Sequence, residues 1–470
     1  MLKIFFISSS LTEISQTLQD TLTNSQLLNS GATQAANIIS KGKAISLSAA
    51  VSGKIFSQIK YLNISYSGEL QVALLTWLPS FVSLGLTPNM PQSMINEIPE
   101  RSVPYVFEKY DVPSSFLINF WENLGVIVFV TMLWLLFNGL ERWLISAKKK
   151  PQITSILRKG RVMIQNFLIT ALYGVYGDLV MFSIIEYRTL VFGWNLSLLS
   201  FFVSVILLLA MFGSFLYQIK LLQTYQKLKK QDPTEPNSLK QFTKDNEGSQ
   251  VYWKDFKDYS LAPQFFLISL SGRDLIFSLI LATMFKHPLV QTILIMILNC
   301  LMLAYLFIKK PFESTIDFGQ QLFFEFIGFI VNFCVFINAI LDTGKYEAIG
   351  ARQNIGKLII ICNMIFNFVT ACFMLFFVAQ ILVEFCKSQQ QKRTTKLEAL
   401  KVLQRNQKQS ISNKKTSFDH NTSEIISFQQ ESFDLGLLPH QIQPAAKFKR
   451  PRKILRNPRP RNQLRREIIN

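Results

Sequence analysis

Long apolar blocks alternate along this chain with short charged segments. Seven blocks are clear, and they are continuously apolar. They cover residues 116–140, 162–185, 196–218, 264–284, 289–308, 321–341 and 358–385. A bilayer core of ~30 Å needs ~20 apolar residues per helix, and continuous apolar runs favour helices over barrel strands. The pattern therefore predicts an all-α membrane protein, folded as a polytopic helical bundle.

Two further segments near the N-terminus are weaker candidates. Residues 35–59 are rich in small residues but carry three lysines, among them Lys54. This segment either crosses the membrane or lies along its surface. Residues 70–86 are more apolar but short, and Pro79 interrupts them. We predict seven clear and about two weaker transmembrane helices. If both weaker segments cross, the chain has nine helices and Lys60 lies in a cytosolic turn.

The connections between blocks differ in charge. The basic ones are residues 141–161, 219–263 and 309–320, and they alternate with less basic ones at 186–195, 285–288 and 342–357. Lys and Arg favour the cytosolic side of a membrane. We therefore expect the basic connections and the C-terminus in the cytosol, in the plasma membrane or an endomembrane. The proline-rich segment 87–115 then lies outside.

Most of the positive charge lies at the C-terminus. The net charge is +19, and residues 387–470 hold 19 Lys/Arg against 6 Asp/Glu, which gives +13. The predicted parts are a polar N-terminal segment (1–34), a transmembrane bundle (35–386) and a basic, largely disordered cytosolic tail (387–470).

The end of this tail is the candidate for contact with anionic lipids. Its most basic cluster contains Lys449, Arg450, Arg452, Lys453 and Arg456. Each such residue near an anionic leaflet contributes about 1 kcal/mol. The other interpretation is a solvated tail that only sets the topology. We expect the lipid bilayer as partner and no nucleic acid, because the tail is tethered to a membrane.

Charged residues inside the blocks are functional candidates, because an ionisable group in a bilayer is costly. Arg273 and Asp274 are adjacent near the middle of block 264–284. Neighbours on a helix point about 100° apart, so the two do not face each other. Arg273 therefore needs a carboxylate from another helix, and Asp178 and Glu325 are available. Such an intramembrane ion pair fixes packing or takes part in gating or ion sensing.

A second polar set lies on the last two blocks. Glu325 and Asn332 are seven residues apart, so they share a helix face. Asn363, Asn367 and Thr370 also share a face, with spacings of four and three. Such stripes form hydrogen bonds between helices or line a polar path.

Nothing in the sequence indicates an enzyme. There are three His, and no nucleotide-binding glycine pattern, HExxH motif or nucleophile elbow is present. The five Cys lie in or at the end of apolar blocks, without the spacing of a disulfide framework or zinc site. We expect no catalytic residues, cofactor or bound metal.

The stretch from Phe265 to Leu341 resembles the membrane module of TRP-like proteins. The resemblance is to the C-terminal helical region of large ciliate surface proteins and, more distantly, to the fungal flavin-carrier TRP-like family. It rests on Arg273, Gln291, Tyr305, Lys310-Pro311-Phe312 and Glu325, with segments 77–91 and 116–125 upstream. It covers residues 35–386 and implies a polytopic module that often follows a cysteine-rich ectodomain. Since no Cys precedes Cys300, it implies a minimal or truncated member.

Three functional hypotheses follow. The resemblance and the polar stripes favour a TRP-like channel or transport module for a cation or small solute. The alternatives are a seven-helix receptor, or a membrane anchor or scaffold of a surface protein without transport activity. The connection 342–357 is too short for a pore helix and filter, so a path would run between helix faces or at a subunit junction. The sequence leaves a homo-oligomer open.

Overall fold

The computed structural model describes most of the chain between Ala44 and Asn421. The described residues are 21, 24, 44–77, 88–99, 101–147, 151–190, 196–231, 236–344 and 348–421. The chain forms two compact units, residues 1–391 and 392–470. All membrane-crossing candidates begin in the first unit.

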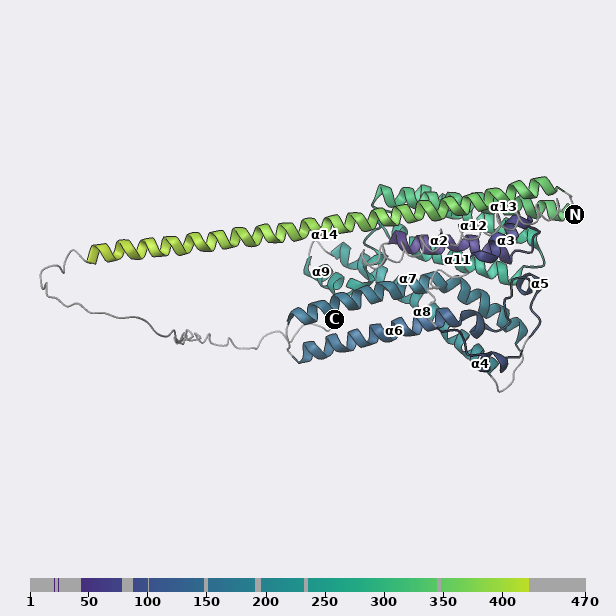
Figure 1. Ribbon diagram of the computed structural model, residues 1–470, viewed down its shortest axis with the longest axis horizontal. Coiled ribbons are helices and arrows are strands. Elements are labelled where there is room, and N and C mark those ends of the chain that lie inside the picture. Colours follow the sequence, from purple (N-terminus) through teal and green to yellow (C-terminus); the bar gives the residue numbers. More distant parts are fainter. Residues whose placement is uncertain are drawn as a thin grey trace, which may run out of the picture. The chain divides into compact units, whose positions relative to one another are not determined.

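Seven helices in the described residues are long and apolar enough to cross a membrane, one for each predicted block. They are α6 (Phe116–Ser146), α7 (Pro151–Thr189), α8 (Leu196–Gln231), α11 (Phe266–Thr283), α12 (Pro288–Lys309), α13 (Thr315–Thr343) and α14 (Ile349–Asn421). The predicted all-α polytopic bundle is therefore confirmed (Figure 1).

Several helices extend beyond their apolar blocks, so the connections are shorter than predicted. Since α6 ends at Ser146 and α7 begins at Pro151, little of the basic connection 141–161 remains outside a helix. Within 219–263 lie α9 (Pro236–Asp245), the 3-10 helix η2 (Glu247–Tyr252) and α10 (Leu261–Gln264). The basic side of the bundle is thus built from helical turns rather than long loops.

Helix α7 is the central helix, whereas α8 is peripheral. The most apolar stretch of α7 is 78% buried, and that of α8 is 17% buried. One stripe of large apolar side chains on α8 is exposed: Phe202, Ile206, Leu209, Phe212 and Leu216. In water a stripe of this size would be an aggregation surface. In a bilayer it contacts acyl chains.

The connections gather at two ends of the bundle. At one end Arg158 pairs with Glu247, and the Lys257 N–H donates to the Pro311 carbonyl. At the other, Arg188 donates to the Ala282 carbonyl. Among the described residues, the basic end comprises 141–147, 151–161, 219–231, 236–263 and 309–314. The opposite end comprises 59–67, 88–99, 101–115, 186–190, 284–288, 342–344 and 348. The predicted segregation of basic connections is therefore present as a spatial arrangement.

The weak candidate 35–59 contains a helix that is buried in the bundle. Helix α2 (Ala44–Gln58) packs against α7, α11 and α13, and every residue except Gly53 is buried. The Ala44 N–H donates to Asp255 at the basic end, over 2.9 Å. Just after α2, the Asn63 amide donates to the Phe285 carbonyl at the opposite end. Helix α2 therefore runs lengthwise through the bundle and does not lie on its surface.

The turn after α2 corrects the predicted nine-helix arrangement. That arrangement placed Lys60 in a cytosolic turn, on the side of the basic connections. The structure instead places η1 (Ile59–Tyr61) and residues 62–67 at the opposite end. The Ser65 N–H donates to Asp342 over 2.6 Å, and Arg352 donates to the Ser65 carbonyl. Lys60 therefore lies at the end away from the basic connections.

Segment 70–86 is described only as far as Trp77. Helix α3 (Gly68–Thr76) begins at the opposite end, and Trp77 packs edge-on against Phe56. The chain is described again from Pro88, whose carbonyl accepts from Trp121 near the start of α6. Residues 78–87 of this candidate lie outside the described residues.

The last helix continues far beyond its apolar block. Helix α14 ends at Asn421, so the first part of the predicted tail 387–470 is helical. The five candidate lipid-binding residues of the tail, and all of 1–34 except Thr21 and Asn24, lie outside the described residues. Within the first unit, α14 packs on α13 through Phe366 and Phe324, whose ring centroids are 5.3 Å apart.

Candidate functional site: a buried charge network

A lysine shared by two carboxylates lies in the centre of the bundle. The Lys54 Nζ on α2 is 3.1 Å from Asp178 Oδ2 on α7 and 3.7 Å from Asp274 Oδ2 on α11. All three side chains are at most 4% exposed. Attraction between buried charges is strong because little water screens them. The three helices are therefore held together by a single ammonium group.

A glycine on α7 allows the helices to approach this closely. The Gly177 N–H donates to Asp274 Oδ2 over 3.0 Å. A Cβ at Gly177 would lie 2.5 Å from that oxygen and 2.6 Å from the Ser278 hydroxyl. Small residues at helix contacts allow the backbones of membrane helices to come together. Gly177 thus sets the distance between α7 and α11 at the level of Lys54.

Replacing Gly177 with alanine is expected to destabilise the bundle by about 1–3 kcal/mol, because the added methyl overpacks this contact. Gly272→Ala on α11 is the matched control, since a Cβ there has no neighbour within 4 Å. The buried thiols Cys334 and Cys362 report unfolding when they react with a fluorogenic maleimide on heating. The exposed Cys300, Cys372 and Cys386 are first replaced by serine. Equal melting temperatures for the two glycine variants would contradict this role of Gly177.

A second ion pair involves Arg273, the residue directly before Asp274 on α11. The Arg273 guanidinium pairs with Glu325 on α13, and both side chains are buried. The other Glu325 oxygen accepts from the Gln321 amide over 3.0 Å, and Gln321 in turn accepts from Ser48 on α2. Every charged atom of the Glu325 carboxylate therefore has a partner from a neighbouring turn or helix.

The two clusters form one assembly, which we call the charge network: Lys54, Asp178, Arg273, Asp274 and Glu325. It is joined by the adjacent residues on α11 and by α2, which carries both Ser48 and Lys54. Lys54 and Glu325 are each ten residues from the basic-end start of their helix, or ~15 Å. That is half of a ~30 Å hydrocarbon core. The network therefore lies at mid-depth of the bundle.

The charge network carries three carboxylates and two cations, a formal charge of −1. Lys60, toward the opposite end, lies close enough to interact electrostatically with Asp178. Lys60 is itself buried, with 7% of its surface exposed. The buried ammonium group of Lys60 thus lies between the net negative charge at mid-depth and the opposite end of the bundle.

The residues of the predicted polar path differ in their hydrogen-bond partners. Asn367 donates to Asn363 on α14 over 2.8 Å, whereas the Thr370 hydroxyl donates to the Phe366 carbonyl of its own helix. Asn332 on α13 is 1% exposed, and neither amide atom has a hydrogen-bond partner among the described residues. Buried amides in native proteins almost always have a protein or water partner. Asn332 is therefore suited to contact water or a polar solute.

Four of the five residues of the charge network were predicted as members of an intramembrane ion pair. Arg273 was expected to meet a carboxylate on another helix, with Asp178 and Glu325 as the candidates. The structure brings Arg273 to Glu325, and Asp178 to Lys54. Lys54 was missed because its charge counted against a membrane helix there. Its five neighbours on either side contain no other charge, which could have indicated a buried lysine in need of acidic partners.

The fold and this network define a multi-pass membrane protein whose helical bundle holds paired charges at mid-depth. Among the described residues, no group of three or more His, Cys, Asp or Glu is placed to hold a metal ion. No protein-family model matches the chain, and neither a curated protein nor a solved structure matches it. The resemblance to TRP-like modules stays a prediction.

Proposed function

We propose that this protein is an ion-transport module, a channel or transporter for a cation or small polar solute. One observation carries the proposal: four different helices bring five ionisable side chains together, all buried, halfway through the bundle. Charged groups are rare inside membrane segments and commonly mark ion pathways. The TRP-like resemblance, which includes Arg273 and Glu325, supports the same class.

The path runs between helix faces in this proposal. Helix α13 ends at Thr343 and α14 begins at Ile349, so this connection has room for no pore helix. The route passes the charge network and the amides of Asn332 and Asn363, on the adjoining helices α13 and α14. A cation moving along it exchanges water for carboxylate and amide oxygens.

Flux through the reconstituted protein tests the proposal. Purified protein in liposomes is expected to dissipate a cation gradient, followed with an ion-sensitive dye. Asn363→Leu is expected to lower the rate at least ~10-fold, because a path residue becomes apolar. Asn138→Leu on the lipid-facing helix α6 is the matched control and keeps the wild-type rate. No flux for the wild-type protein, or equal rates for both variants, would overturn the proposal.

A membrane anchor or scaffold is the second candidate. The observation that favours it is the length of α14, which continues to Asn421 although its apolar block ends at residue 385. A helix this long offers a surface for a partner protein. In this case the charge network only fixes helix packing, and shortening α14 after residue 391 changes location or partners without any effect on flux.

A further inference from the structure

A basic pocket lies at the surface of the basic end, between α7, α9 and η2. Its volume is about 620 Å³, within the ~300–1,000 Å³ typical of small-molecule sites. The charged residues that line it are Arg158, Lys159, Lys240, Lys244 and Glu247. Four cations and one carboxylate give it a formal charge of +3.

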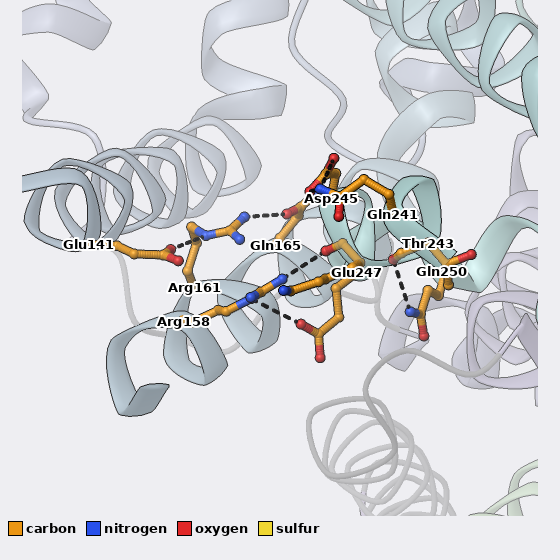
Figure 2. A network of polar contacts seen from close by, with 10 residues as sticks. Glu141, Arg158, Arg161, Gln165, Gln241, Thr243, Asp245, Glu247 and Gln250 are labelled. Carbon is orange, nitrogen blue, oxygen red and sulfur yellow. Dashed lines mark hydrogen bonds and ion pairs between the residues drawn. The ribbon is translucent and has the colours of Figure 1, made fainter. Parts of the chain in front are cut away.

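Polar contacts hold the walls of this pocket in place (Figure 2). Arg158 on α7 pairs with Glu247 over 3.3 Å and donates to the Lys244 carbonyl over 2.8 Å. Gln165, two helical turns after Arg158 on α7, donates to Ser249 over 3.3 Å. These bonds fasten α9 and η2 to α7, so the pocket is a fixed feature of the fold.

Three of the cations are available to a ligand. No described residue forms a salt bridge with Lys159, Lys240 or Lys244, and all three side chains are exposed. The single carboxylate, Glu247, is occupied by Arg158. Lysines are compact charges that suit phosphate. Thr243 and Gln250 add polar groups for ring hydroxyls.

The position of the pocket matches the headgroup layer. The apolar block of α7 begins at residue 162, four residues or ~6 Å beyond Arg158. The polar layer of a bilayer leaflet is itself about 5–8 Å thick. A ligand in this pocket is therefore level with phospholipid headgroups. The residues that line the pocket belong to α7, α9 and η2, and none of them belongs to the predicted tail.

We propose that this pocket binds an inositol headgroup that carries two or more phosphate groups. Each phosphate monoester carries about −1.5 to −2 charges at pH 7, so two of them match the +3 of the pocket, whereas a single-charge headgroup does not. The same chemistry is presented by a phosphoinositide in the membrane and by a free inositol phosphate. The proposal does not depend on ion transport.

Calorimetry on the full-length protein in nanodiscs of neutral lipid tests the proposal. Three probes are titrated: short-chain phosphatidylinositol bisphosphate, inositol trisphosphate and short-chain phosphatidylserine. The pocket variant Lys240→Gln/Lys244→Gln is expected to bind the bisphosphate about 30-fold more weakly, from ~1 kcal/mol per lysine. The matched control, Lys227→Gln/Lys254→Gln, removes two exposed lysines of the same end outside the pocket and keeps wild-type affinity.

The probes and a tail variant separate the outcomes. Binding of the bisphosphate lipid alone supports a membrane source, and binding of the trisphosphate as well supports a free ligand too. A tail variant with glutamine at Lys449, Arg450, Arg452, Lys453 and Arg456 is expected to retain saturable binding. Equal affinity for phosphatidylserine, equal losses in the pocket and control variants, or loss only in the tail variant would overturn the proposal.

Discussion

Lys54→Met is expected to destabilise the bundle by about 3–5 kcal/mol, the cost of leaving a buried charge without its partner. The substitution leaves Asp178 and Asp274 close together with no ammonium between them. Asp178→Asn is expected to cost less, because Lys54 then still pairs with Asp274 at 3.7 Å. Lys54→Met is thus expected to be less stable than Asp178→Asn, because one cation pairs with two carboxylates.

The thermal reactivity of Cys334 and Cys362 measures this order. Lys357→Met is the matched control, since that lysine on α14 is 51% exposed and its nearest acid is 4.0 Å away. Neutralising all three residues together, as Lys54→Met/Asp178→Asn/Asp274→Asn, is expected to recover part of the loss, because no charge remains buried there. If Lys54→Met melts at the temperature of Lys357→Met, the ion cluster contributes nothing to the fold.

Arg273→Met is expected to have a comparable effect, again about 3–5 kcal/mol, because Glu325 remains buried with only Gln321 as a donor. The double variant Arg273→Met/Glu325→Met removes both charges and is expected to be more stable than either single variant. The effects of the two substitutions are then not additive, as is typical of residues in direct contact.

A double-mutant cycle on the same thiol assay tests the pairing. Coupling of at least about 1 kcal/mol is expected for Arg273 with Glu325. Arg273 with Asp342 provides the comparison, because Asp342 pairs with Arg352 at the opposite end. If the losses of stability in the Arg273 and Glu325 single variants add up to the loss in the double variant, the two residues act independently. The pairing of Arg273 with Glu325 in the charge network would then be contradicted.

Local patterns were sufficient for the membrane helices. A run of twenty apolar residues has one stable arrangement in a bilayer, a helix whose backbone groups are satisfied within the segment. Each of the seven blocks is one helix for this reason. Helix ends were less predictable. The polar residues at both ends of α6, α7 and α8 are compatible with a helix that continues into the headgroup layer and with one that ends at the membrane boundary.

The N-terminal region shows where local patterns were not sufficient. Lys54 counts against membrane insertion when residues 35–59 are considered alone. Its cost depends on two carboxylates that lie more than 120 and 200 residues further along the chain, at Asp178 and Asp274. Likewise, the side on which Lys60 lies depends on whether 70–86 crosses, which its own hydropathy leaves undecided.

The sequence alone determined the number of strongly apolar helices, the segregation of basic connections and the need of Arg273 for a carboxylate on another helix. These follow from the length of apolar runs, from charge counts and from the angle between neighbouring residues. Only the tertiary structure decided that α2 lies inside the bundle, that Lys54 joins Asp178 to Asp274, and that Arg273 pairs with Glu325. The choice among partners depends on which helices are adjacent, and adjacency is set by packing of the whole bundle rather than by any single segment.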